Sequence, residues 1–96
     1  MVKSEESSRI IITVLGHDRV GIIAGIATIL AEAGINILDI SQTILQGFFT
    51  MVMVADMSGS SLDIARLREL LNEKGREMDV QITVQHEDIF NFMHRI

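Results

Sequence analysis

A short polar turn contains the residues of this 96-residue chain that are best suited to bind a small molecule. It spans residues 16–19 (Gly-His-Asp-Arg) and follows the apolar run of residues 9–15. Asp18 stands where its carboxylate would accept a hydrogen bond from the backbone N–H of Val20 or Gly21 and so cap a helix. Gly21 has no side chain, which allows a ligand to approach the first amides of that helix closely. Those amides form the positive end of the helix dipole and favour a carboxylate or a phosphate.

The same pattern has a structural interpretation that the residues alone leave open. In this alternative, Asp18 only caps the helix and Gly21 only lets the helix pack on the preceding strand. The turn lacks both the lysine of a phosphate-binding loop and the glycine triplet of a dinucleotide-binding loop. The sequence therefore does not indicate a nucleotide site.

No other group of residues has the spacing of a catalytic or metal site. The chain has no cysteine, which excludes thiolate catalysis and thiolate metal ligands. Its three histidines are His17, His86 and His94, and none forms an H-x-x-x-H or H-E-x-x-H pair. No nucleophile elbow is present either. We predict that the protein is not an enzyme, with no catalytic residue, no metal and no cofactor.

Composition narrows the class of protein further. Hydrophobic residues make up 48% of the chain and charged residues 22%, which predicts one small folded domain. The net charge of −5 argues against direct nucleic-acid binding, which favours a basic face. No apolar run is long enough for a membrane span, and the N-terminus lacks the apolar stretch of a signal peptide. We therefore expect a cytoplasmic protein with no membrane partner.

The elements that must position the turn follow from hydrophobic periodicity. Residues 9–15 are apolar on both faces apart from Thr13, which is typical of a central strand. Apolar residues then recur every three or four positions over residues 19–33, which predicts a helix, and Gly34 follows where a helix end favours a left-handed residue. Residues 36–45 alternate between apolar and polar and predict a half-buried strand.

The second half of the chain shows the same kinds of signal. Residues 46–47 (Gln-Gly) separate two runs of β-forming residues, which predicts a tight hairpin and a strand at residues 48–55. Residues 60–63 have the S-x-x-D form of a helix start, and Gly75 weakens or ends this helix, which we expect to end between Lys74 and Met78. Residues 80–86 alternate again and predict the last strand.

The order β-α-β-β-α-β predicts an α+β, ferredoxin-like fold. In it, a four-stranded antiparallel sheet has two helices on one face, the first and third strands are central, and the second and fourth lie at the edges. We expect this domain to span residues 9–86, between a flexible N-terminus (residues 1–8) and a C-terminal tail (residues 87–96).

The sheet face away from the helices is predicted to be partly apolar, because Ile11 and Leu15 must point there. A domain of this size rarely leaves such a surface uncovered. The tail is apolar as well and includes Phe90 and Phe92. We expect the tail to pack on its own sheet or on the partner in a homodimer.

Two segments together resemble the opening half of an ACT domain. They are D-R-V-G-I-I-A at residues 18–24 and A-E-A-G-I-N-I at residues 31–37. The resemblance covers about residues 9–86, and the tail is similar to that of small stand-alone ACT proteins, which resemble the repressor of the glycine cleavage system. It implies a β-α-β-β-α-β module that binds amino acids and regulates amino-acid metabolism.

The resemblance also implies where a ligand would lie. A free amino acid would occupy the space between the first turn and the start of the second strand, often at a subunit interface. Backbone amides near Gly21 would hold its carboxylate, Asp18 would contact its ammonium group, and Asn36 would bind its backbone groups. The implied ligand-binding residues are Asp18, Arg19, Val20, Gly21, Ile22, Asn36 and Ile37.

We therefore predict a non-catalytic regulatory module that binds a small amino acid at the first strand–helix turn as a homodimer. Two departures from the family pattern are Val20 in place of a frequent proline and Gly16 in place of a polar side chain found in several binders. Since some ACT domains bind nothing, the alternative is a ligand-free module for protein–protein interaction or dimerisation.

Overall fold

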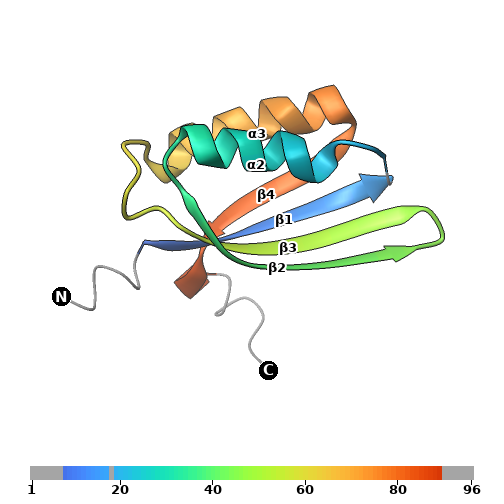
Figure 1. Cartoon of the computed structure of the whole chain (residues 1–96), viewed down its shortest axis with the longest axis horizontal. Helices are drawn as coiled ribbons and strands as arrows, with labels where there is room; N and C mark the ends of the chain where they lie inside the picture. Colours follow the sequence, from blue (N-terminus) through green and yellow to red (C-terminus); the bar gives the residue numbers. More distant parts are fainter. Residues whose placement is uncertain (1–7, 18, 90–96) are drawn as a thin grey trace.

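The computed structural model describes residues 8–17 and 19–89 of the chain. The elements in chain order are β1 (Arg9–His17), α2 (Ile22–Glu32), β2 (Asn36–Leu45), β3 (Phe48–Asp56), α3 (Ile64–Met78) and β4 (Val80–His86). The strands form an antiparallel sheet in the order β2-β3-β1-β4, and α2 and α3 lie side by side on one of its faces (Figure 1). This confirms the ferredoxin-like fold, with β1 and β3 central and β2 and β4 at the edges.

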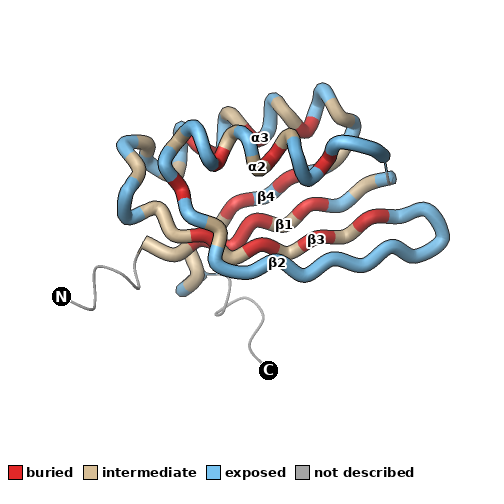
Figure 2. The backbone as a smooth tube through the Cα atoms, viewed as in Figure 1, coloured by how far each residue is buried: buried red, intermediate tan, exposed pale blue. Residues whose placement is uncertain are grey.

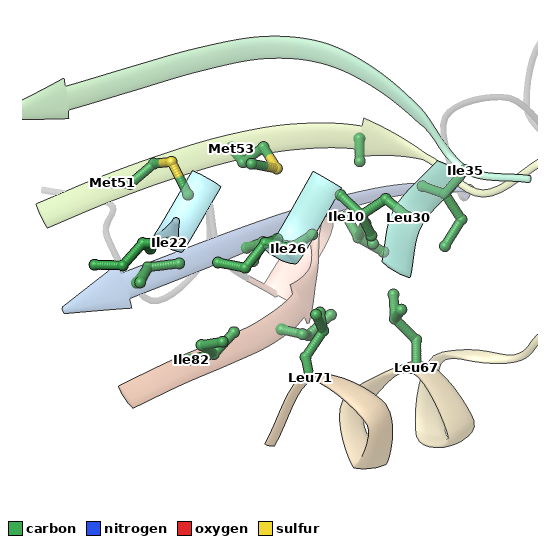
Figure 3. Close-up of a cluster of buried hydrophobic side chains, with 14 of the residues drawn as sticks. Ile10, Ile22, Ile26, Leu30, Ile35, Met51, Met53, Leu67, Leu71 and Ile82 are labelled. Carbon is green, nitrogen blue, oxygen red and sulfur yellow. The ribbon is translucent and has the colours of Figure 1, made fainter. Parts of the chain in front are cut away.

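The hydrophobic core fills the layer between the sheet and the helices (Figure 3). Each large side chain that is removed from water there contributes roughly 1.5–3 kcal/mol. Every element except β2 supplies at least one such side chain. The most deeply buried large side chains are Ile10, Ile12, Val14, Ile22, Ile26, Leu30, Met51, Met53, Leu67 and Leu71, with Ile82 close behind.

Both ends of α2 are set by glycines. The helix begins at Ile22 and not at residue 19 as predicted, because Gly21 occupies the N-cap position with φ +95°. At the other end, Gly34 adopts φ +76° as predicted. The N–H of Gly34 donates to the carbonyl of Ala31 (3.1 Å) and that of Ile35 to the carbonyl of Leu30 (2.9 Å). This pair of bonds is a Schellman motif, which turns the chain into β2.

Helix α3 starts later than its sequence pattern suggested and ends within the predicted range, at Met78. Asp63 is itself the N-cap, and its Oδ1 accepts from the N–H of Arg66 at 2.8 Å, whereas the S-x-x-D pattern placed the start at residue 60. The helix then runs through Gly75 to Met78. Gly75 is buried, and a Cβ at this position would lie 2.7 Å from the carbonyl oxygen of Val80. Glycine therefore allows β4 to pass close under the helix.

The hairpin between β2 and β3 is confirmed. Gln46 and Gly47 both have positive φ, 51° and 85°, as a type I′ turn requires. Strand β2 departs from its prediction, because its residues are exposed on both faces apart from the half-buried Ile37 (Figure 2). Ile40 and Ile44 lie on the helix side, opposite Met53 and Phe49, yet they are 40% and 54% exposed. The helices do not extend over β2, so this edge strand is not half-buried.

The sheet face away from the helices is apolar where it was expected to be. Leu15 is 46% exposed there, whereas Ile11 is only 6% exposed. Residues 87–89 form a helical turn on this side of the sheet (Figure 1). Glu87 pairs with Arg9 of β1 at 2.9 Å. The remaining tail residues, 90–96, and residues 1–7 of the predicted flexible N-terminus lie outside the described residues, so their predicted roles stay predictions.

The two glycines inside the helices give a test of this packing. We expect Gly75→Ala to lower the free energy of unfolding by about 1–2 kcal/mol, since overpacking against the Val80 carbonyl outweighs the gain in helix propensity. Gly25→Ala is the matched control. A Cβ at Gly25 meets the flexible Sδ of Met78 at 3.2 Å, so its stability should stay level or rise by up to about 1 kcal/mol. Urea unfolding of both variants checks this, and equal stability of the two would contradict it.

Candidate functional site

Gly16 and His17, which the sequence pattern placed in the turn, are the last two residues of β1. The turn therefore begins after His17, where the end of β1 is flanked by strands on both sides. Gly16 pairs with Phe49 of β3 and with Val80 of β4. A Cβ at Gly16 would lie 2.8 Å from Cγ1 of Val80, so a larger residue here would push β4 away. One residue later, the ring of His17 stacks on Phe48 with centroids 5.0 Å apart. The start of the turn is therefore held at a defined place at the end of the sheet.

The N-terminal tip of α2 has no cap among the described residues, which exclude Asp18. None of their side chains makes a cap hydrogen bond at Gly21, and none of them would come within 4 Å of a Cβ there beyond the adjacent residues. Val20 is fully exposed at 100%. The Gly21 carbonyl accepts from the N–H of Gly25 (2.9 Å), which closes the first helical turn. This arrangement suits an anionic group. Asp18 lies outside the described residues, so its predicted capping and ammonium-binding roles stay predictions.

Arg19 faces α3. Its guanidinium Nη1 donates to the backbone carbonyl of Met78 at 2.8 Å. Met78 is the last residue of α3, and the final carbonyls of a helix have no partner within it. This hydrogen bond joins two segments that are 59 residues apart in the sequence.

Asn36 and Ile37 lie at the other end of the molecule from the tip. Asn36 pairs with Asp56, which pairs with Arg9 at the start of β1, whereas the turn follows the end of β1. The eleven residues of α2 separate the two places by about 16 Å along the helix axis. Ile37 is partly buried and packs against the core. Of the predicted ligand-binding residues, residues 19–22 therefore lie together at the tip. Asn36 and Ile37 of the same chain do not reach them.

A groove among the described residues lies away from the predicted site. An open groove of about 820 Å³ follows α3 and the outer side of β4, and its lining includes Asn72, Arg76 and Gln81 but none of the predicted site residues. Within the described parts of the chain, no three His, Asp or Glu side chains are grouped so that they could hold a metal ion. None of the helices there is long and apolar enough to cross a membrane.

Sequence reasoning missed how the turn is anchored. The bond from Arg19 to Met78 has no sequence signature, because it depends on where α3 ends in space. One feature of the sequence could have predicted the contact between Gly16 and Val80. A glycine at the end of an otherwise apolar strand often marks the close approach of another backbone.

Comparison with known proteins places this geometry in a family. The ACT domain model matches residues 8–85. A UPF0237 protein of Methanocaldococcus jannaschii is 53% identical over 89 residues, which are 93% of this chain and 99% of that one. An ACT domain protein from Streptococcus pneumoniae superposes with a TM-score of 0.75 at 43% identity, covering 85% of this chain and 92% of that one.

A third match is the crystal structure of a putative glycine cleavage system transcriptional repressor. It has a TM-score of 0.70 and 28% identity, and the match covers 80% of this chain and 44% of the repressor. The chain belongs to the ACT domain family. The resemblance inferred from residues 18–24 and 31–37 is confirmed, including the similarity to the glycine cleavage repressor group.

The positive φ at Gly21 predicts how substitutions there affect stability. We expect Gly21→Val to lower the free energy of unfolding by about 1–3 kcal/mol, because a β-branched residue is strained at positive φ. Gly21→Asn should cost less than about 1 kcal/mol, since asparagine tolerates this region. Urea unfolding measures both. Equal losses in the two variants would show that backbone strain does not set the cost.

Proposed function

We propose that this protein is a non-catalytic regulatory module that binds a small free amino acid at the tip of α2. We further propose that it acts as a homodimer in the cytoplasm, with each binding site shared between two copies. The observation that carries the proposal is Gly21 at the N-cap of α2, where no described side chain caps the helix, in a chain that belongs to the ACT domain family.

The chemistry of the tip suits the carboxylate of an amino acid. Backbone N–H groups at Gly21 and Ile22 would donate to it in charge-assisted hydrogen bonds, and the helix dipole adds to them. Gly21 itself puts no side chain over these amides, and beyond its chain neighbours none of the described residues comes within 4 Å of its Cβ position. Asp18 is the proposed partner of the ammonium group, and the amide of Asn36, which both donates and accepts, is the proposed partner of the ligand's backbone groups.

The two edges of the sheet differ in a way that supports pairing through β2. At the β4 edge, Arg68 of α3 covers the carbonyl of Val84 with two donors, Nε at 3.3 Å and Nη2 at 2.8 Å. A charged side chain at this place discourages the addition of another strand. Strand β2 is exposed and presents Ile40 and Ile44 beside its edge. A second copy could therefore cover apolar surface while pairing with β2.

Pairing through β2 would also bring the proposed site residues of two copies to the same end of the sheet. An antiparallel pair centred between Ile40 and Ser41 sets Asn36 of one copy opposite Leu45 of the other. Leu45 pairs with Phe48, which pairs with His17 at the end of β1, so it lies at the end of the sheet from which the turn departs. Asn36 of each copy would thus lie at the same end of the sheet as the α2 tip of the other copy, whereas in its own chain it lies at the opposite end.

The second candidate function is a ligand-free dimerisation module. The observation that favours it is the separation of Asn36 from the tip in one chain, together with the exposed apolar residues of β2. Both candidates need the dimer, but only the first needs a ligand. Ligand binding therefore separates them.

We expect at least one of the twenty amino acids to raise the melting temperature of the wild type. A ligand at one hundred times its dissociation constant adds about 2.7 kcal/mol, or roughly 10–20 °C for a domain of this size. The Gly21→Asn variant is the control, because its side chain would stand over the amides while the fold is retained. No shift with any amino acid at millimolar concentration would leave only the dimerisation module.

Mixed dimers test whether the site is shared. Homodimers of Gly21→Asn and homodimers of Asn36→Ala should both fail to bind. A heterodimer of the two variants has one site with both changes and one site with neither, so calorimetry should recover one binding site per dimer. If each site belonged to a single chain, every site in the heterodimer would carry one change. A heterodimer that does not bind, made from variants that still dimerise, would overturn the shared site.

A further inference from the structure

We propose that Arg19 is a positioning residue that holds the turn in its binding conformation by tying it to the end of α3, and that it does not contact the ligand. The expected loss of ligand affinity rests on the proposed function. The role of Arg19 in ordering the turn does not. Arg19 belongs to the turn that follows β1, and Nη1 of its guanidinium donates to the Met78 carbonyl at 2.8 Å. This bond directs the guanidinium toward the end of α3.

The partner of Arg19 is chemically well suited to hold it. Met78 ends α3, where the backbone carbonyls have no helical partner and the helix dipole is negative. The N–H of Asp79 makes the last bond of the helix, to the carbonyl of Gly75. Because α3 ends at Met78, no later helical N–H bonds to the Met78 carbonyl, which accepts from Arg19 instead. A cation at this end of a helix is stabilised by both the hydrogen bond and the dipole.

Packing contacts on both sides of the turn converge on the same short segment, residues 78–80. Before the turn, Gly16 packs against Val80, where a Cβ would lie 2.8 Å from Cγ1. After it, Gly25 of α2 faces the side chain of Met78, with Sδ 3.2 Å from a Cβ position. The segments on both sides of the turn therefore pack against the junction between α3 and β4. Arg19 adds a hydrogen bond from the turn itself to this junction.

The described residues of the turn, which exclude Asp18, make few other contacts that order it. Val20 is fully exposed, and the Cβ position of Gly21 has open space around it. Gly21 is also free to leave φ +95° for other conformations, because glycine has access to most of φ/ψ space. Without the tie, the binding conformation becomes one of several, and the apparent affinity falls in proportion to its population.

Backbone dynamics test the tie without any ligand. We expect ¹⁵N relaxation to give order parameters near 0.85 for Val20 and Gly21 in the wild type, and below about 0.6 in Arg19→Ala. Arg19→Lys should keep them high, because one ammonium donor can replace the single bond to Met78. Arg66→Ala is the matched control, since Arg66 is an exposed arginine that pairs with Glu69 on α3. Rigid turn amides in Arg19→Ala, or mobile ones in Arg19→Lys, would overturn the proposal.

Calorimetric titration with each of the twenty amino acids tests the consequence. The amino acid that binds the wild type should bind Arg19→Ala about tenfold more weakly, and Arg19→Lys within about threefold of the wild type. Weaker binding with a turn that stays rigid would instead make Arg19 a ligand contact and overturn the proposal. If no amino acid binds the wild type, the proposed function fails, while the order parameters still decide whether Arg19 holds the turn.

Discussion

The close packing around Val80 is the constraint on which the rest of this structure depends. Its backbone carbonyl lies where a Cβ on Gly75 would come within 2.7 Å, and its side chain lies where a Cβ on Gly16 would come within 2.8 Å. Glycine at both positions lets α3, β4 and the end of β1 approach more closely than larger residues would allow. Because the turn after β1 starts from this point, its position is set by the packing of the α3–β4 junction.

The molecule has one closely packed side and one open side. Strand β4 lies under α3, and Arg68 covers part of its outer edge. Strand β2 extends beyond the helices with its side chains exposed (Figure 2). The α2 tip belongs to the packed side, while Asn36 belongs to the open side at the far end of the sheet. Within one chain the α2 tip and Asn36 therefore lie apart, in surroundings that are packed to different degrees.

Strand boundaries were predictable where the local pattern and the tertiary environment agree. Strands β2 and β4 have the predicted limits, 36–45 and 80–86, because the hairpin turn and the alternation act locally. The predicted helix starts were wrong, because φ +95° at Gly21 and the cap at Asp63 depend on the direction from which each strand or loop enters. The alternation of β2 predicted that one of its faces is buried. That face is exposed because the two helices do not extend over this edge strand.

The amino-acid sequence by itself determined the order of elements, the sheet topology and the family, since these depend on hydrophobic periodicity, turn residues and two recognisable segments. It also marked Gly21 as a position where a helix tip is open to a ligand. Only the tertiary structure decided that Arg19 contacts the end of α3, that β2 is exposed on both faces and that Asn36 lies about 16 Å from the tip along α2. The physical reason is that periodicity reports which face of an element is apolar, whereas contacts between distant segments depend on where each element ends in space.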